Sequence, residues 1–166
     1  MRSKIGQKEE AIRALEIAKQ GNSLSDTGWE LLGVQLWEIN RHEEAFVIWE
    51  EGIQNYPDYL MFYNRLAVYY REAGDRAAEK DAIEHWFADG QMQDDSAHFH
   101  YRLGLLLMLD SPEEALDELL LASHLDEEFA PVVETLRTSL NLASLENNPA
   151  EKQILLGRGL ALAGEW

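Results

Sequence analysis

The 166-residue sequence predicts an all-α protein built from antiparallel pairs of helices. Three observations lead to this prediction. Apolar residues recur at spacings of three and four along most of the chain, which is the period of one face of a helix. Short polar segments separate these stretches, and the chain contains only four prolines. The pattern of residues 26–59 also returns in the segments that follow, which indicates an internal repeat.

The repeating pattern is clearest in residues 26–59. Two sets of apolar and small residues each fall on one helical face: Trp29, Leu32, Gly33 and Leu36, then Ala45, Ile48, Trp49, Gly52 and Ile53. The polar break at residues 40–42 is short enough to force a helical hairpin. Pro57 ends the second helix because proline cannot continue it.

Close packing explains the residue types in this hairpin. Gly33 lets the facing helix approach without a Cβ in the way, and Ala45 does the same from the other side. Trp29 and Trp49 fill the volume around that contact. One such hairpin would also suit an ordinary globular bundle, so further copies decide between a bundle and a repeat.

Trp29, Leu32-Gly33, Ala45 and Pro57 resemble the signature of the tetratricopeptide repeat (TPR) family. The resemblance extends over nearly the whole chain. It implies a right-handed superhelical solenoid of antiparallel helix pairs, with about nine helices in residues 1–166. In this family the first helices of successive units line a concave groove that holds a partner.

The repeat pattern divides the chain in order. Residues 6–11 resemble residues 40–45, so a partial unit over residues 1–25 is expected to contain a turn at Gly6. Ser25-Asp26 offers an N-cap to the next helix. After the repeat at residues 26–59, a second copy spans about residues 60–96 and a third about 97–129.

Both later copies carry the same landmarks. The first helix is marked by Leu66-Ala67 in one copy and Leu103-Gly104 in the other. Gly74-Asp75 predicts a turn, and Gly90 is expected to end a helix. Ser111-Pro112 predicts a capped helix start, with Ser111 as the cap.

Residues 130–166 form a weaker helical pair. An apolar stripe is expected along Val133, Leu136, Leu140 and Leu145. Arg137 stands where the small residue of the pattern belongs, so tight pairing is not predicted there. The last helix, after Asn148-Pro149, has two interpretations. By order it is a second helix, and by its Leu156-Gly157 motif it is a first helix.

The amino-acid composition excludes some classes of binding partner. With 14 Lys and Arg against 31 Asp and Glu, the formal net charge is −17, which argues against nucleic acid and against an anionic membrane surface. No apolar run is long enough to span a bilayer, and no signal peptide is recognised. The absence of cysteine suits a reducing compartment, and a cytoplasmic location is expected.

The ends of the repeat pattern suggest self-association. Solenoids need polar capping elements at their ends, and none is recognised in this sequence. We therefore interpret the chain as a piece of a longer repeat array. Its apolar ends would pair between molecules as an end-to-end homodimer.

No motif for catalysis or cofactor binding is recognised, and neither a cofactor nor a metal is expected. His98 and His100 are two residues apart, so on a helix they point to different faces. The acidic pairs, such as Glu43-Glu44 and Glu113-Glu114, fall in first turns of helices, where the helix dipole favours negative charge. The chain is therefore predicted not to be an enzyme.

The predicted binding site is the concave groove. Its candidate residues lie on first helices and face away from the second helices: Val34, Trp37, Asn64, Arg65, Val68, Arg71, Tyr101, Arg102, Leu105 and Met108. Arg65 and Arg102 fall at equivalent places in adjacent units. Because arginine forms paired bonds with carboxylates, we expect a protein or peptide partner that carries an acidic group.

Two alternatives bear on this groove. The arginines can instead pair internally, with neighbours such as Glu30 and Glu72. Some TPR proteins resemble chaperone adaptors that clamp a C-terminal carboxylate with Lys, Asn and Arg. This chain has Glu30 and Val34 where the clamp needs Lys and Asn, and only the arginine is kept, at Arg102, so a chaperone clamp is not predicted. A scaffold for protein–protein interaction is thus the predicted function. The alternative is a structural, self-associating segment, and an enzyme or small-ligand sensor is the more distant option.

Overall fold

A computed structural model describes residues 2–87 and 96–164 of the chain, and the predicted helix end at Gly90 lies outside them. The described residues form nine α-helices and one 3₁₀ turn, with no strand. Within them, no helix combines the length and the apolar character that crossing a membrane requires. The chain divides into two compact units, Met1–Asp89 and Gly90–Trp166, which are described separately.

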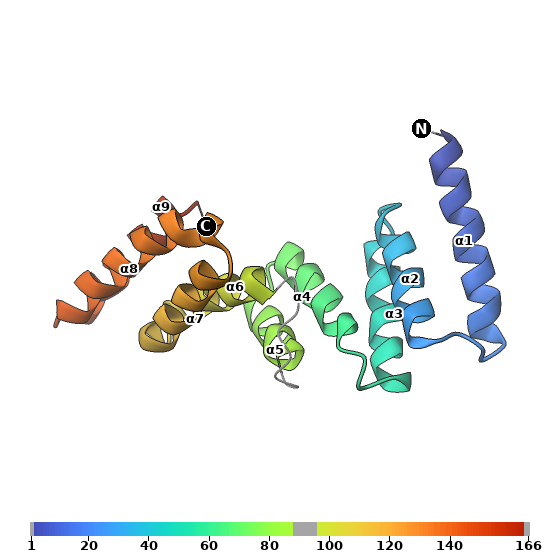
Figure 1. Cartoon of the computed structure of the whole chain (residues 1–166), viewed down its shortest axis with the longest axis horizontal. Coiled ribbons are helices and arrows are strands. Elements are labelled where there is room, and N and C mark those ends of the chain that lie inside the picture. The colour runs from blue at the N-terminus through green and yellow to red at the C-terminus, as the bar shows by residue number, and fades with distance from the viewer. Residues whose placement is uncertain (1, 88–95, 165–166) are drawn as a thin grey trace. The chain divides into compact units, whose positions relative to one another are not determined.

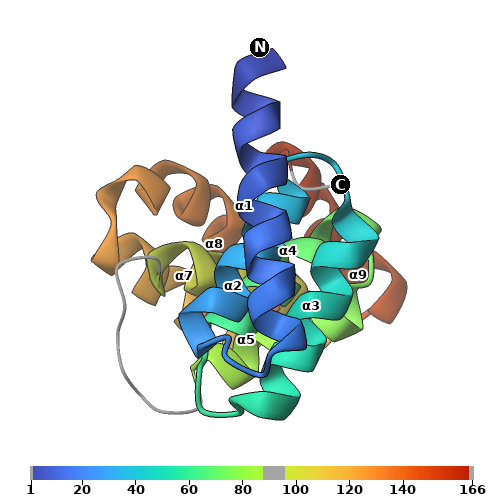
Figure 2. The ribbon, with the colours of Figure 1, turned by 90° about the vertical axis from the view of Figure 1, so that its right-hand side faces the viewer.

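Unit 1 contains the first five helices: α1 (Arg2–Gln20), α2 (Asp26–Trp37), α3 (His42–Asn55), α4 (Met61–Ala73) and α5 (Arg76–Trp86). α2 pairs with α3 and α4 pairs with α5, each across a short loop (Figure 1). α1 packs against α2 (Figure 2), and α3 packs against α4. The helix pairs predicted from residues 26 to 86 are therefore present.

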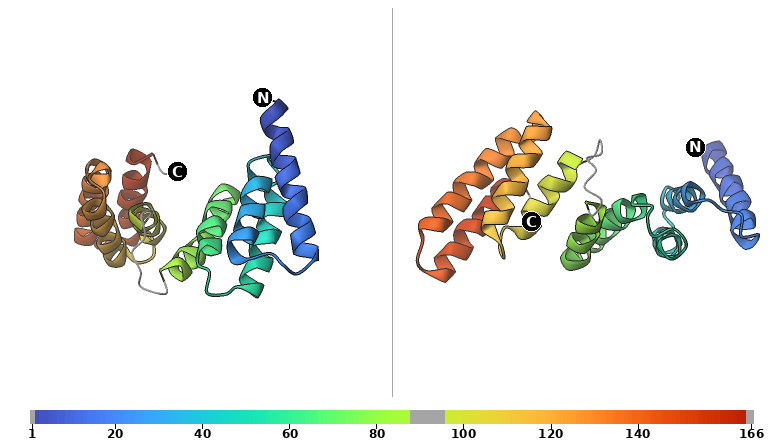
Figure 3. Two further views of the ribbon diagram at one scale, coloured as in Figure 1. Left: turned by 45° about the vertical axis from the view of Figure 1, so that its right-hand side comes forward. Right: turned by 60° about the horizontal axis from the view of Figure 1, so that its bottom comes forward.

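Unit 2 contains the remaining helices: α6 (Ser96–Leu107), α7 (Pro112–Leu125), the 3₁₀ turn η1 (Glu127–Phe129), α8 (Ala130–Leu145) and α9 (Pro149–Leu162). α6 pairs with α7 and α8 pairs with α9, as the antiparallel ribbons of Figure 3 show. α9 is thus the second helix of its pair, which decides between the two interpretations of its sequence.

Several helix ends follow the capping signals in the sequence. The hydroxyl of Ser25 accepts a hydrogen bond from the Gly28 amide at 3.1 Å, and Asn148 caps α9 through the Ala150 amide at 3.0 Å. Gly74 ends α4 in the left-handed conformation, with φ of 74°. Ser111 occupies the N-cap position of α7 but makes no side-chain cap bond, so its predicted capping role is wrong.

The predicted turn at Gly6 is also wrong. α1 runs from Arg2 to Gln20 without a break and includes Gly6. A Cβ built at Gly6 would have no neighbour within 4 Å, so no close contact requires a glycine there. A single glycine costs a helix only about 1 kcal/mol, which is too little to stop it without a competing turn.

Close approach at small residues holds the pairs together, as predicted for Gly33 and Gly104. A Cβ built at Gly33 would overlap the indole ring of Trp49. A Cβ built at Gly104 would lie 2.6 Å from Cγ of Leu119. No side chain larger than hydrogen fits at either position unless the facing helix moves.

The α8–α9 pair is tighter than predicted, because its small residues lie elsewhere. Gly159 of α9 approaches Ser139 of α8, and a Cβ at Gly159 would lie 2.6 Å from the Ser139 hydroxyl oxygen. Arg137 is exposed and pairs with Glu134 at 2.8 Å instead. The predicted apolar stripe holds for three residues, but Leu145 at its end is 79% exposed.

Gly33→Ala is expected to lower the free energy of unfolding by about 1–3 kcal/mol, because the new methyl group displaces the Trp49 ring. Gly6→Ala is the matched control. There the methyl group meets no neighbour, and the helix gains up to about 1 kcal/mol. Urea unfolding followed by far-ultraviolet circular dichroism measures both. Equal stability of the two variants would contradict the packing role of Gly33.

Candidate functional site

Four of the predicted groove residues line one pocket in unit 1. Val34 and Trp37 come from α2, and Arg65 and Val68 come from α4. Trp49 of α3 completes the wall, and the pocket encloses about 90 Å³. The sequence assigned Trp49 only to packing, because its helical spacing matches the core face. We call this cavity the α2–α4 pocket.

Aromatic stacking makes the walls of the α2–α4 pocket rigid. The Trp37 ring stacks on His42 with centroids 4.0 Å apart and planes at 9°. Its centroid lies 5.7 Å from that of Trp49, whose indole nitrogen donates a hydrogen bond to the backbone oxygen of Glu30 at 3.3 Å. Val68 is 41% exposed, so the pocket offers an accessible apolar surface between fixed rings.

Arg65 is not an open anion site in this structure. Its Nε and Nη2 atoms both donate to Oε1 of Glu30, at 3.1 and 2.6 Å. The Tyr59 hydroxyl donates to the other carboxylate oxygen of Glu30 at 2.7 Å. Internal pairing with Glu30, the alternative stated for the groove arginines, is therefore what the structure contains at this position.

The Glu30 carboxylate also shifts the pKa of the Tyr59 hydroxyl. Burial of the phenol, the hydrogen bond to Glu30 and the negative charge of Glu30 together raise the pKa of Tyr59 to about 12. All three effects favour the neutral phenol, because ionisation would place a second negative charge beside the carboxylate. The Tyr59 hydroxyl thus remains a donor through the physiological pH range.

The other predicted residues of unit 1 lie outside the pocket lining. Asn64 is buried, with 5% of its surface exposed, so it belongs to the packed interior. Arg71 is exposed on α4 and makes no ion pair within the described part of the chain. Glu72 lies 3.8 Å from a ring nitrogen of His42 rather than beside an arginine. Among the described residues of unit 1, Arg71 is therefore a groove arginine without an ion-pair partner.

The predicted residues of unit 2 are mostly used in packing. Leu105 and Met108 are 2% and 0% exposed, so they are not accessible to a ligand and leave the candidate site. The methyl carbon of Met108 lies 3.6 Å from a Cβ built on Gly159, which explains its burial against α9. Tyr101 stacks on Phe129 at 4.8 Å, and Arg102 is half-buried.

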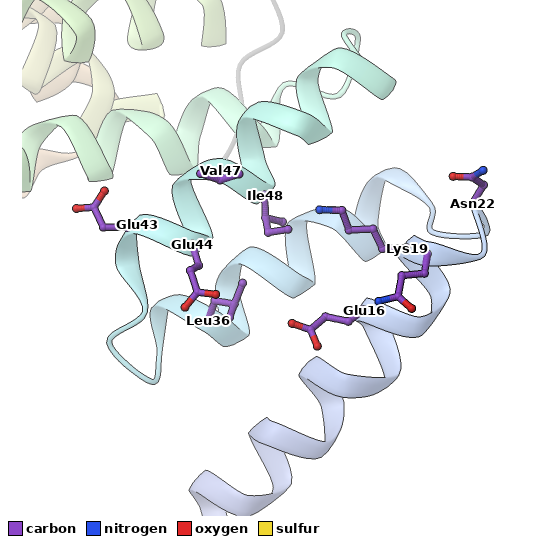
Figure 4. Close-up of a pocket in the computed structure, with 9 residues that line it drawn as sticks. Glu16, Lys19, Asn22, Leu36, Glu43, Glu44, Val47 and Ile48 are labelled. Carbon is purple, nitrogen blue, oxygen red and sulfur yellow. The ribbon is translucent and has the colours of Figure 1, made fainter.

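A second and larger cavity of unit 1 was not predicted. It lies between α1, α2 and α3, encloses about 630 Å³ and is shown in Figure 4. Its lining comes from three helices and the turn after α1: Glu16, Lys19, Gln20, Asn22, Leu36, Glu43, Glu44, Val47 and Ile48. α1 and α3 both pack on α2, and the cavity is the space left between them. We call it the α1–α3 wedge.

No sequence signal marks this wedge. Glu43 and Glu44 have a sufficient local explanation in the first turn of α3, where the helix dipole favours acidic residues. The cavity depends on the spacing of two helices that contact a third, and residue patterns within each helix carry no information about that distance.

The histidines offer no metal site in the described residues. His100 is buried on α6 and lies 2.6 Å from a carboxylate oxygen of Glu118 on α7, whereas His98 is exposed. Across residues 2–87 and 96–164, no group of three or more His, Asp or Glu side chains could hold a metal ion. The contact between His100 and Glu118 joins α6 to α7.

No known protein family, curated protein or solved structure matched the chain. What the chain does must therefore be inferred from the geometry of its own side chains.

Tyr59→Phe tests the network around Glu30 through its dependence on pH. The folded pKa of Tyr59 is about 12, above the value of about 10 for an unfolded tyrosine. The stabilisation linked to this proton is complete below about pH 10 and is lost as the pH rises towards 12. Between these values the wild type should lose stability relative to Tyr59→Phe. Urea unfolding at pH 9 and pH 11 measures the difference, and parallel curves would exclude the network.

Proposed function

We propose that this chain is a TPR-like helical-repeat scaffold that binds a segment of a protein or peptide and has no catalytic activity of its own. One observation carries the proposal. Residues selected from the repeat pattern alone, on two successive first helices, line a common pocket with an accessible apolar mouth. The close helix pairing at Gly33 and Gly104 supports the repeat interpretation.

The dimensions of the α2–α4 pocket favour one side chain of a larger partner. Its volume of about 90 Å³ is well below the roughly 300–1,000 Å³ that encloses a typical small-molecule ligand. Two indole rings and two valines provide apolar contact. An aliphatic side chain anchored here, with the rest of the segment running over α2 and α4, suits these features.

The arginines near the pocket determine which charged group of the partner lies beside the anchored side chain. Glu30 neutralises Arg65, so the expected acidic group of the partner has to pair with Arg71 instead. Arg71 lies just under two turns beyond Arg65 on α4. Arg71 is exposed, so its guanidinium can form two parallel bonds with a carboxylate. The net charge of −17 favours a protein partner over nucleic acid, and a cytoplasmic role is proposed.

Val68→Asp tests the scaffold proposal. Peptides selected from a random 12-residue display library against the full chain should bind the wild type, and Val68→Asp should weaken them at least tenfold, because a carboxylate then occupies the apolar mouth. Ile17→Asp is the matched control, since Ile17 is exposed on α1 and lines neither pocket. Fluorescence anisotropy gives the affinities. Equal affinities for wild type and Val68→Asp would contradict the proposal.

Self-association is a second candidate function, and the outer surface of unit 2 favours it. Large apolar side chains are exposed on its last two helices: Leu142, Leu145, Ile154 and Leu162. A shallow depression along α9 adds Gly157 and Ala161 beside Ile154. A second copy of the chain could cover such a surface, and stacking rather than groove binding would then be the role.

Ile154→Asp tests this second candidate. If α9 forms a homodimer contact, sedimentation velocity at high concentration should detect a dimer for the wild type and a shift to monomer for Ile154→Asp. The control is Leu31→Asp, which changes an exposed leucine of unit 1. A wild type that stays monomeric at every concentration would rule out the homodimer.

A further inference from the structure

The α1–α3 wedge has an apolar floor that the proposed groove function does not use. Leu36 of α2 and Val47 and Ile48 of α3 contribute this floor, and Val47 is 48% exposed. The volume of about 630 Å³ is enough for several side chains. The α2–α4 pocket has none of these residues in its lining, so the wedge is a separate surface of unit 1.

Two carboxylates of the wedge lack a cationic partner. Glu16 of α1 and Glu43 of α3 both belong to the lining, at its opposite edges, and in Figure 4 the Glu43 carboxylate points away from Glu16. Within the described residues neither forms an ion pair, although Glu43 accepts a hydrogen bond from the Tyr69 hydroxyl at 2.9 Å. The lining of the cavity therefore combines an apolar floor with two carboxylates that form no ion pair.

The nearby cations are already committed. Lys19 forms an ion pair with Glu51, and its ammonium lies 4.8 Å from the centroid of the Trp29 ring. Arg41 donates two hydrogen bonds to Glu44, at 2.6 and 2.5 Å. These bonds lower the pKa of Glu44, so that carboxylate stays ionised together with its arginine. Neither cation forms an ion pair with Glu16 or Glu43, although the charge of Glu16 contributes to the raised pKa of Arg41.

We propose that the α1–α3 wedge is a second docking site, for a peptide segment that presents an apolar side chain next to a lysine or arginine. The apolar side chain would cover Val47 and Ile48, and the cation would pair with a carboxylate of the lining, Glu16 or Glu43. Charge complementarity selects this occupant, because an acidic segment would meet two unpaired carboxylates. A bare cation would leave the apolar floor uncovered.

The wedge is built to hold such a segment without rearrangement. Its walls are helices that each pack on α2, so the spacing between α1 and α3 does not depend on a loop. The ion pair of Lys19 with Glu51 joins the two walls at one end. A preformed site of this kind loses little conformational entropy when it binds.

The test uses a fluorescein-labelled 14-residue peptide of alternating leucine and lysine pairs, and the full chain. The double variant Glu16→Gln with Glu43→Gln should weaken its binding at least fivefold. The charge-matched control is Glu10→Gln with Glu50→Gln, which alters the same two helices outside the wedge and should change affinity less than twofold. This control is needed because a basic peptide is attracted anywhere on a protein of net charge −17.

A second measurement separates the wedge from the α2–α4 pocket. Amide shifts caused by the peptide in nuclear magnetic resonance spectra should fall on residues 12–22 and 43–51. Val47→Ser should lower the affinity for the peptide, whereas Val68→Asp should leave this affinity unchanged. The proposal would be overturned if both double variants weakened peptide binding equally, if the wild type did not bind the peptide, or if the amide shifts were confined to other residues.

Discussion

Three of the four helix pairs, α2–α3, α6–α7 and α8–α9, close around a glycine, and the surfaces of both units depend on this contact. Gly33 meets the Trp49 ring, Gly104 meets Leu119, and Gly159 meets Ser139. A methylene added at any of these positions would push the helices apart. The contact therefore sets the distance between paired helices and decides which side chains remain outside the pair.

In unit 1 the same contact shapes the candidate binding pocket. The Trp49 ring lies over Gly33 and also forms a wall of the α2–α4 pocket. Glu30 connects packing to charge, because its backbone oxygen accepts from Trp49 while its carboxylate holds Arg65 and Tyr59. One residue thus positions an aromatic wall and cancels the charge beside it, which leaves the pocket mainly apolar.

Unit 1 offers two surfaces of different chemistry, one lined by α2, α3 and α4 and the other by α1, α2 and α3. The α2–α4 pocket combines aromatic walls with the charge of Arg71 on the same helix as Val68. The α1–α3 wedge combines an apolar floor with the carboxylates of Glu16 and Glu43. The proposed scaffold would hold two segments of unlike charge at once, because neither surface shares a lining residue with the other.

The sequence by itself determined the helices, most of their ends and the small residues at Gly33 and Gly104, because helical period, capping and the need for close approach are local properties. It also selected four lining residues of the α2–α4 pocket. Only the tertiary structure decided that Arg65 is neutralised by Glu30, that Leu105 and Met108 are buried, and that a cavity lies between α1 and α3. These outcomes depend on distances between helices, and such distances arise from the packing of all side chains at once.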